Sequence, residues 1–132
     1  MPETYKYRET TGKIIGAAME VHKFLGNGFQ EVIYQRALAI EFTQWQIDYK
    51  REFEMPIYYR GNHIGTRRVD FLINDLIALE IKAVIEIQEV HMAQAINYLE
   101  AYNIEVGLLI NFGARSLEFK RVYNSKYKPV NP

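Results

Sequence analysis

The sequence between residues 67 and 82 reads Arg67-Arg-Val-Asp-Phe-Leu-Ile-Asn-Asp-Leu-Ile-Ala-Leu-Glu-Ile-Lys82. Apolar residues dominate it, yet Asp70, Glu80 and Lys82 place three charges inside what otherwise has the pattern of buried strand. A charged side chain in such a setting needs a partner or an ion. Because side chains alternate along a strand, Glu80 and Lys82 point to one face and the apolar residues beside them to the other. We therefore expect one face to be core and the other to be a functional site.

The preceding strand is predicted to bring a second acid to the same place. Val69 and the apolar residues at alternate positions after it are expected on the core face, which puts Asp70 on the opposite face. If the intervening turn has an odd number of residues centred on Asp75, Asp70 stands directly across from Glu80. The predicted geometry is a convergence of the two carboxylates and the Lys82 amine on one face of the sheet.

Two carboxylates held close together repel each other, which raises the pKa of at least one unless a cation lies between them. Oxygen ligands alone favour a hard ion, Mg²⁺ or Mn²⁺, which keeps several waters. A lysine beside that ion can orient or deprotonate an attacking water, or stabilise the charge that develops on a phosphate. These parts suit phosphodiester hydrolysis. The alternative is a pair of Glu80 and Lys82 on an exposed sheet face, with Asp70 simply solvated.

Periodicity and turn residues predict the elements on both sides of this stretch. Apolar residues at helical spacing predict a helix over residues 12–25, capped by Thr10 and Thr11, and a second over 31–45 after a Gly-rich corner. The remaining expected elements are strands at 49–59, 67–73 and 76–87, a helix at 88–102, and strands at 104–111 and 116–123.

The resulting order is ααβββαββ, without an internal repeat or a linker. It predicts a single α/β domain over residues 1–132, or α+β by a stricter definition, with a mixed sheet flanked by helices. The tails at residues 1–9 and 124–132 are expected to be loose.

Composition sets the class of protein. The 132 residues are 48% hydrophobic and 24% charged, as in a globular protein, and no apolar run is long enough to cross a membrane. Without cysteine or an apolar leader sequence, a cytoplasmic location is expected and thiolate chemistry is excluded. Sixteen basic and sixteen acidic residues balance, so the molecule as a whole lacks the positive field typical of nucleic-acid binding.

The helix after the candidate site adds two polar side chains. Gln94 and Tyr98 are one turn apart on one helix face and are expected to reach the same phosphate or metal-bound water. With Asp70 ending one strand and Glu80-Ile-Lys82 on the next, the sequence resembles the PD-(D/E)XK nuclease superfamily. The Gln94-x-x-x-Tyr98 arrangement is similar to the one that follows this motif in RecB-type nucleases. Val69 precedes Asp70 where the superfamily motif has proline, a departure that concerns backbone shape more than ligation.

The N-terminal half extends the resemblance. Gly28, Glu31 and Tyr34 fit the Gly-x-x-Glu-x-x-Tyr pattern of the GxxExxY family, which is placed in that superfamily. By this resemblance Glu31 is the first-helix acid that completes the acidic cluster at the metal. Tyr34, one turn later, lies on the same helix face and is expected to orient it. The alternative for Glu31 is a charge that only stabilises a helix start through the helix dipole.

These observations predict a Mg²⁺- or Mn²⁺-dependent nuclease acting on DNA or RNA. Asp70 and Glu80 would hold the ion with the carbonyl of Ile81, Lys82 would position the water, and Gln94 with Tyr98 would steady the phosphate. A non-catalytic module that keeps the scaffold and binds nucleic acid or a partner protein is the second hypothesis. A homodimer is compatible with both, since so small a domain covers little DNA.

Overall fold

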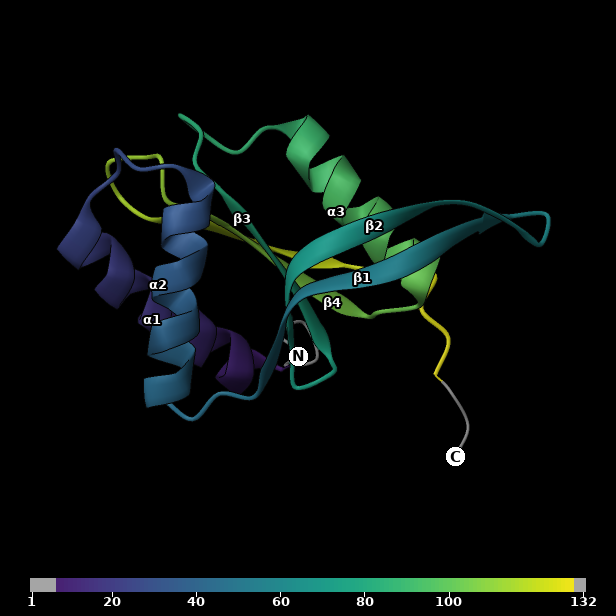
Figure 1. Ribbon diagram of the computed structural model, residues 1–132, viewed down its shortest axis with the longest axis horizontal. Coiled ribbons are helices and arrows are strands. Elements are labelled where there is room, and N and C mark those ends of the chain that lie inside the picture. Colours follow the sequence, from purple (N-terminus) through teal and green to yellow (C-terminus); the bar gives the residue numbers. More distant parts are fainter. Residues whose placement is uncertain (1–6, 130–132) are drawn as a thin grey trace.

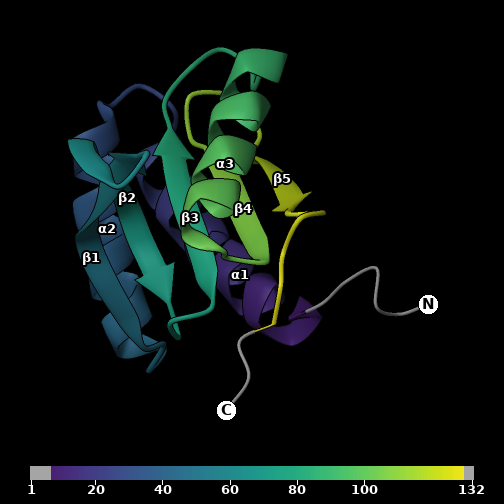
Figure 2. The ribbon, with the colours of Figure 1, turned by 90° about the vertical axis from the view of Figure 1, so that its right-hand side faces the viewer.

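The computed structural model describes residues 7–129, and within them the chain forms three helices and a five-stranded mixed sheet in the predicted order. The elements are α1 (Arg8–Leu25), α2 (Glu31–Gln44), β1 (Tyr49–Tyr59), β2 (Asn62–Ile73), β3 (Ile77–Lys82), α3 (Glu89–Tyr102), β4 (Val106–Asn111) and β5 (Glu118–Tyr123). Helices α1 and α2 cover one face of the sheet and α3 covers the other (Figure 1, Figure 2). The predicted α/β fold with a mixed sheet between helices is confirmed.

The strands lie side by side in the order β1-β2-β3-β4-β5. Strands β3 and β4 run parallel because α3 connects them as a crossover, while the other neighbouring pairs are antiparallel. Between β2 and β3, Ile73 pairs with Ile77, so the turn is centred on Asp75 as predicted. Asp75 has a positive φ of 57°, a conformation that aspartate tolerates better than most residues.

Strands β1 and β2 form a long hairpin that projects beyond the rest of the domain (Figure 1). Its tip is a two-residue loop in which Arg60 and Gly61 have φ values of 51° and 79°. Positive φ at both loop residues is the type I′ geometry, whose twist matches that of the flanking strands. The tip therefore closes the hairpin without splaying it.

The base of this hairpin is bent, and the bend changes which faces the side chains of β2 occupy. Glu52 in β1 has a φ of 53°, which interrupts the regular pleat opposite residue 70. Val69 packs in the core under α3, whereas Phe71 packs in the core under α1 and α2. The expectation that Val69 shares a face with Phe71 is therefore wrong, and Asp70 lies at the bend between them.

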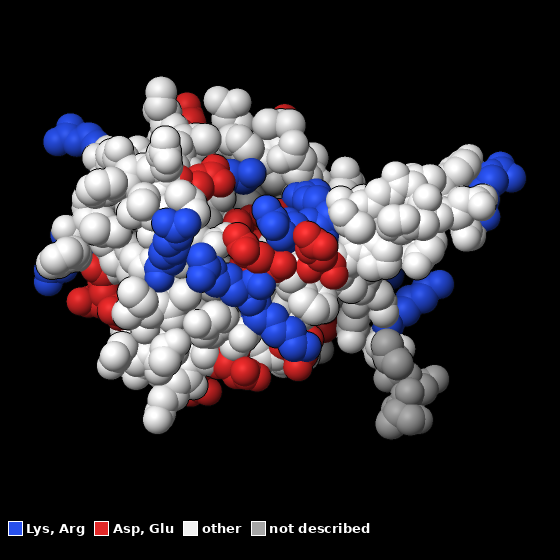
Figure 3. Space-filling view, in the orientation of Figure 1, with Lys and Arg blue, Asp and Glu red and all other residues white. Residues whose placement is uncertain are grey.

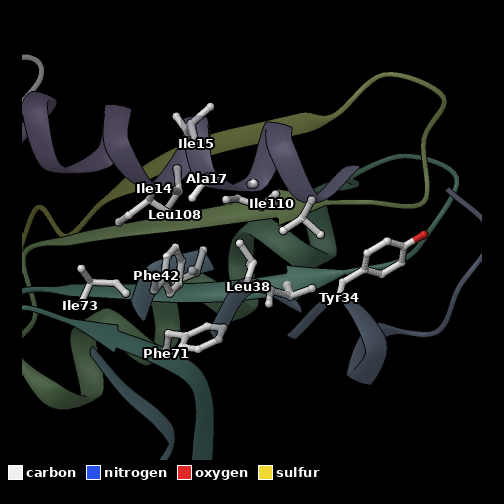
Figure 4. Close-up of a cluster of buried hydrophobic side chains, with 14 of the residues drawn as sticks. Ile14, Ile15, Ala17, Tyr34, Leu38, Phe42, Phe71, Ile73, Leu108 and Ile110 are labelled. Atoms are coloured by element: carbon white, nitrogen blue, oxygen red, sulfur yellow. The ribbon is translucent and has the colours of Figure 1, made fainter. Parts of the chain in front are cut away.

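Two cores hold the layers together. In the larger one, Phe42 of α2 meets Phe71 edge to face with ring centroids 5.1 Å apart, a favoured aromatic geometry. Figure 4 shows the aliphatic side chains around this pair, including Leu38 of α2 and Leu108 of β4. The second core lies between α3 and the opposite face of the sheet and includes Leu99.

Several boundaries differ from the sequence-based expectation, and strand β2 begins at Asn62 rather than at residue 67. Helix α1 begins at Arg8, so Thr11 is no cap; it is fully buried and its hydroxyl donates to the Arg8 carbonyl at 3.1 Å. Strand β3 ends at Lys82, before the predicted limit at residue 87. Asn124, predicted to begin a loose tail, is buried and its amide donates to the carbonyl of Leu99 at 3.1 Å. The chain after β5 is therefore packed at its start.

The outer ends of the two predicted tails, residues 1–6 and 130–132, lie outside the described residues. Within residues 7–129, none of the helices combines the length and the apolar character that crossing a bilayer requires.

Candidate active site

The candidate site lies where β2 and β3 separate. Their paired register runs outward from the turn to Phe71 and Leu79. One step beyond, Oδ2 of Asp70 accepts a hydrogen bond from the backbone N–H of Ile81 at 2.7 Å. A side chain thus takes the place of a backbone partner, which keeps the strands apart and holds the carboxylate between them.

The same bond sets the direction of the Ile81 carbonyl. The N–H and C=O of one residue point to the same side of an extended strand. Because the N–H of Ile81 points to Asp70, its carbonyl oxygen also lies on the Asp70 side of β3. The side chain of Ile81 is buried in the larger core, so only its backbone faces the site.

The second oxygen of Asp70 is held by a residue that the sequence did not identify. Nε2 of Gln35 in α2 donates to Oδ1 of Asp70 at 2.9 Å, and Oε1 of Gln35 accepts from Nε of Arg51 at 2.9 Å. The two bonds together fix which end of the amide faces the carboxylate. The available signal was a buried polar residue beside the apolar stripe of α2, but nothing in the sequence indicated its partner.

Glu80 and Lys82 occupy the same face of β3, as their spacing predicted, because Leu79 and Ile81 between and beside them pack in the larger core. Oε1 of Glu80 accepts a 2.6 Å hydrogen bond from Nη2 of Arg67, an ion pair whose acid is only 13% exposed. Sequence reasoning missed Arg67 as a partner, since it lies on β2 beyond the point where the strands are paired.

Electrostatics link these groups. Burial raises the pKa of Glu80, and the nearby Asp70 carboxylate raises it further, while Arg67 and Lys82 oppose the shift. The two acids are therefore close enough to repel each other, and two cations balance them. Figure 3 shows acidic and basic side chains gathered over the middle of this view, between the helical part of the domain and the hairpin.

Helix α3 brings Tyr98 to the site, in a position that differs from the expectation. Its ring is almost completely buried beneath Arg67, whose Cζ lies 5.5 Å from the ring centroid. Its hydroxyl donates to Sδ of Met55 at 3.4 Å, and burial raises its pKa. Tyr98 is thus placed to support Arg67. Gln94, one turn earlier on α3, is exposed.

The loop after Lys82 is fastened by the fully buried Asn111 of β4. Its Oδ1 accepts from the N–H groups of Val84 and Gly113, each at 2.9 Å, and its Nδ2 donates to the Val84 carbonyl at 2.9 Å and to Oε1 of Glu118 at 3.0 Å. All four hydrogen-bonding positions of the amide are used. This clamp fixes the end of β3 that carries Lys82.

Glu31 does not join the two acids. Among residues 7–129, no group of three or more acidic, histidine or cysteine side chains is arranged to hold a metal. Glu31 is exposed in the first turn of α2, one turn before Gln35, where its charge complements the helix dipole. The expectation that it completes an acidic cluster is therefore wrong for this structure.

Tyr34 is fully buried and lies flat against Phe112, with ring centroids 4.6 Å apart. Its hydroxyl donates to the Gly26 carbonyl at 2.6 Å and accepts from the N–H of Phe29 at 3.1 Å. The hydroxyl is thus committed to the corner between α1 and α2, and the expected orienting of Glu31 is replaced by a role in shaping that corner.

A pocket of about 210 Å³ adjoins the ion pair between Arg67 and Glu80. It lies between the hairpin and α3, and its lining residues are Ile57, Arg67, Asn97, Tyr98, Ala101 and Tyr102. Arg67 is therefore shared by the pocket and by the acidic pair.

Comparison with known proteins gives a family. A sequence model of the PD-(D/E)XK nuclease superfamily matches residues 8–122. Among solved structures, the chain is similar to one described as "Crystal structure of SSO0001", with 19% identity and a TM-score of 0.56 over 71% of this chain and 50% of that one. This chain thus spans half the length of that protein, and at such identity the likeness shows the fold alone. A search of curated proteins found no match. Because the family match covers most of the sequence, the chain belongs to the PD-(D/E)XK nuclease superfamily.

Proposed function

We propose that this protein is a Mg²⁺- or Mn²⁺-dependent nuclease that hydrolyses phosphodiester bonds in DNA or RNA. The observation that carries the proposal is the meeting of Asp70 and Glu80 where β2 and β3 separate, with Lys82 on the same strand face as Glu80. Membership of the superfamily supports a nuclease-like function, and its nucleases generally use divalent metals.

The donor set fits such an ion. Carboxylate oxygens of Asp70 and Glu80 and the carbonyl of Ile81 are hard ligands, which suit Mg²⁺ or Mn²⁺ better than softer metals. The raised pKa of Glu80 reflects burial and repulsion from Asp70, and a bound cation would relieve both costs. When bound, the ion would supply Lewis-acid activation of a phosphate oxygen or of water.

The other residues take roles that follow from their positions. Lys82 shares a strand face with Glu80, and its charge lowers the pKa of that acid; in this role it orients the attacking water or stabilises charge on the phosphate. Gln94, exposed on α3, is available to contact the phosphate. Tyr98 acts indirectly by supporting Arg67. Glu31, exposed at the start of α2, is not one of the proposed ligands.

We further propose that the chain falls in the GxxExxY subfamily, on the pattern Gly28-x-x-Glu31-x-x-Tyr34. The hydrogen bonds of the Tyr34 hydroxyl give a reason for tyrosine in that pattern, since it joins the end of α1 to the start of α2. No comparable reason for Glu31 arises from its contacts.

The experiment that tests the function begins with metal. Mn²⁺ at roughly a hundred times its dissociation constant should stabilise the folded protein by about 2.7 kcal/mol, measured as a rise in melting temperature. Asp70→Ala should lose this rise, because it removes a ligand. A melting temperature that millimolar Mn²⁺ leaves unchanged, both in wild-type protein alone and in its mixture with nucleic acid, would contradict a metal site.

Cleavage is tested on single-stranded, double-stranded and branched DNA and RNA. Lys82→Ala should keep metal binding and lose cleavage, because Lys82 acts on the water or phosphate rather than on the ion. Lys82→Arg should not restore cleavage, since a planar guanidinium does not replace a compact ammonium. Cleavage that survives Lys82→Ala unchanged would point to a contaminating nuclease and refute this assignment.

The second candidate function is a catalytically quiet module that binds nucleic acid or a partner protein. The observation in its favour is the 2.6 Å ion pair of Glu80 with Arg67, which already neutralises one of the two acids. In that case Mn²⁺ does not bind and no substrate of the panel is cut, whereas Arg67→Met destabilises the fold.

A further inference from the structure

Arg67 makes three contacts that meet in one guanidinium. It donates to Oε1 of Glu80 at 2.6 Å, its Cζ lies 5.5 Å from the centre of the Tyr98 ring, and it lines the pocket between the hairpin and α3. The first contact belongs to the acidic pair and the last to an open cavity of about 210 Å³. The Tyr98 ring under Arg67, which also lines the cavity, is a flat surface on which a guanidinium can stack.

The contact with Glu80 has a direct consequence for a cation. Arg67 occupies one oxygen of the Glu80 carboxylate, so a divalent ion that binds Glu80 would compete with the guanidinium for that carboxylate. The local charges of Asp70, Glu80, Arg67 and Lys82 sum to zero, which leaves little net attraction for a cation arriving alone.

The pocket offers the guanidinium a second partner. Arginine can bind a phosphate through two parallel N–H groups. In its bond to Glu80, Arg67 uses only one nitrogen, so this capacity is not fully used. A nucleic-acid backbone that enters between the hairpin and α3 would meet Arg67 in the pocket that Tyr98 and Tyr102 also line.

We propose that Arg67 couples the two binding events: a phosphodiester group in this pocket draws the guanidinium from Glu80 and thereby frees the carboxylate for the divalent ion. The inference rests on the proposed function and adds to it that the metal site is completed by substrate. Tyr98 keeps the guanidinium within reach of both partners. Metal therefore binds weakly to the protein alone and more tightly when nucleic acid is present.

Thermodynamic reciprocity makes this measurable. If nucleic acid raises metal affinity by some factor, metal raises nucleic-acid affinity by the same factor. Mn²⁺ is titrated calorimetrically into wild-type protein, alone and saturated with a short single-stranded DNA or an RNA of the same sequence, with strand integrity checked on a gel. We expect at least about fivefold tighter Mn²⁺ binding with nucleic acid, the lower end of typical coupling.

The Arg67→Met variant distinguishes coupling through Arg67 from a direct attraction between the metal ion and the phosphate. Methionine can still lie over the Tyr98 ring but cannot occupy Glu80. In this variant Mn²⁺ alone should bind about fivefold tighter than in wild type, and the coupling factor should fall. Arg68→Met is the matched control, because its side chain is exposed and paired only loosely with Glu54 at 4.0 Å. It should leave both quantities at their wild-type values.

Arg67→Lys is the second variant if Arg67→Met does not fold; it keeps the charge but not the planar fork, and should shift metal affinity in the same direction by a smaller factor. Equal Mn²⁺ affinity in wild type and the Arg67 variants, or an unchanged coupling factor, overturns the proposed coupling while leaving the metal site intact. Failure of Mn²⁺ to bind wild type and both variants, with or without nucleic acid, refutes the metal-dependent function as well.

Discussion

Asn111→Ala should cost this domain a large part of its stability, because one buried side chain holds the loop after β3. The wild-type amide makes four hydrogen bonds of 2.9 to 3.0 Å, three of them to backbone groups of Val84 and Gly113. A hydrogen bond contributes about 0.5–1.5 kcal/mol net, so the four together set a range of about 2–6 kcal/mol. Water can reach the half-buried Val84 and replace part of this loss, and we expect about 3 kcal/mol.

The measurement is urea denaturation of wild type and Asn111→Ala without metal, extrapolated to water. Asn97→Ala is the control, since Asn97 is an exposed residue of α3 and its replacement should change the free energy of unfolding by less than about 0.5 kcal/mol. A loss below about 1 kcal/mol for Asn111→Ala, at an unchanged m-value, would refute the clamp.

The remaining predictions concern backbone space, charge and support of the site. Gly113→Ala should destabilise by about 1–3 kcal/mol, because an added Cβ would collide with the Val84 carbonyl oxygen. Gly28→Ala meets open space and should be neutral in the same thermal melts. The pKa of Glu80 is raised in the folded state, so in EDTA its contribution to stability is present below pH 4.5 and is lost as pH rises through the raised value. Glu80→Gln should therefore reduce the fall of the free energy of unfolding with pH, measured by urea titrations at several pH values. An equal or steeper fall in the variant would contradict this assignment. Gln35→Ala should weaken Mn²⁺ binding by about 10–100-fold in calorimetry by releasing Asp70, with exposed Gln44→Ala as the control that should not.

The sequence predicted the layered fold because periodicity is a local property. The alternation around Glu80 and the apolar stripes of the helices depend only on near neighbours, and both are confirmed. The register of β2 against β3 could also be predicted from the sequence, because a short turn centred on Asp75 leaves one pairing that keeps both core faces buried.

Features that depend on residues far apart in the sequence could not be predicted in this way. Gln35 meets Asp70 across 35 positions, and its amide is needed only because the strands separate there. The change of face between Val69 and Phe71 follows from a single left-handed residue, Glu52, on the neighbouring strand. A prediction from strict alternation of side chains takes no account of such a bend, and it therefore put Val69 on the same face as Phe71.

Arg67 illustrates a different limit. Its charge was visible in the sequence, but its reach to Glu80 depends on the gap between two strands rather than on spacing along either. Tyr98 was identified as a site residue, yet its burial beneath Arg67 gives it a supporting position that helix spacing alone does not specify.

The unequal size of the two cores has a consequence for local unfolding. Helices α1 and α2 pack on their face of the sheet through the larger core, while α3 packs on the other face through the smaller core. Segments with fewer buried apolar contacts open at lower free energy than the whole domain. Backbone amides of α3 should therefore exchange with deuterium before those of α1 and α2, and the face that carries Arg67 and Tyr98 can open and reclose while the opposite face stays folded.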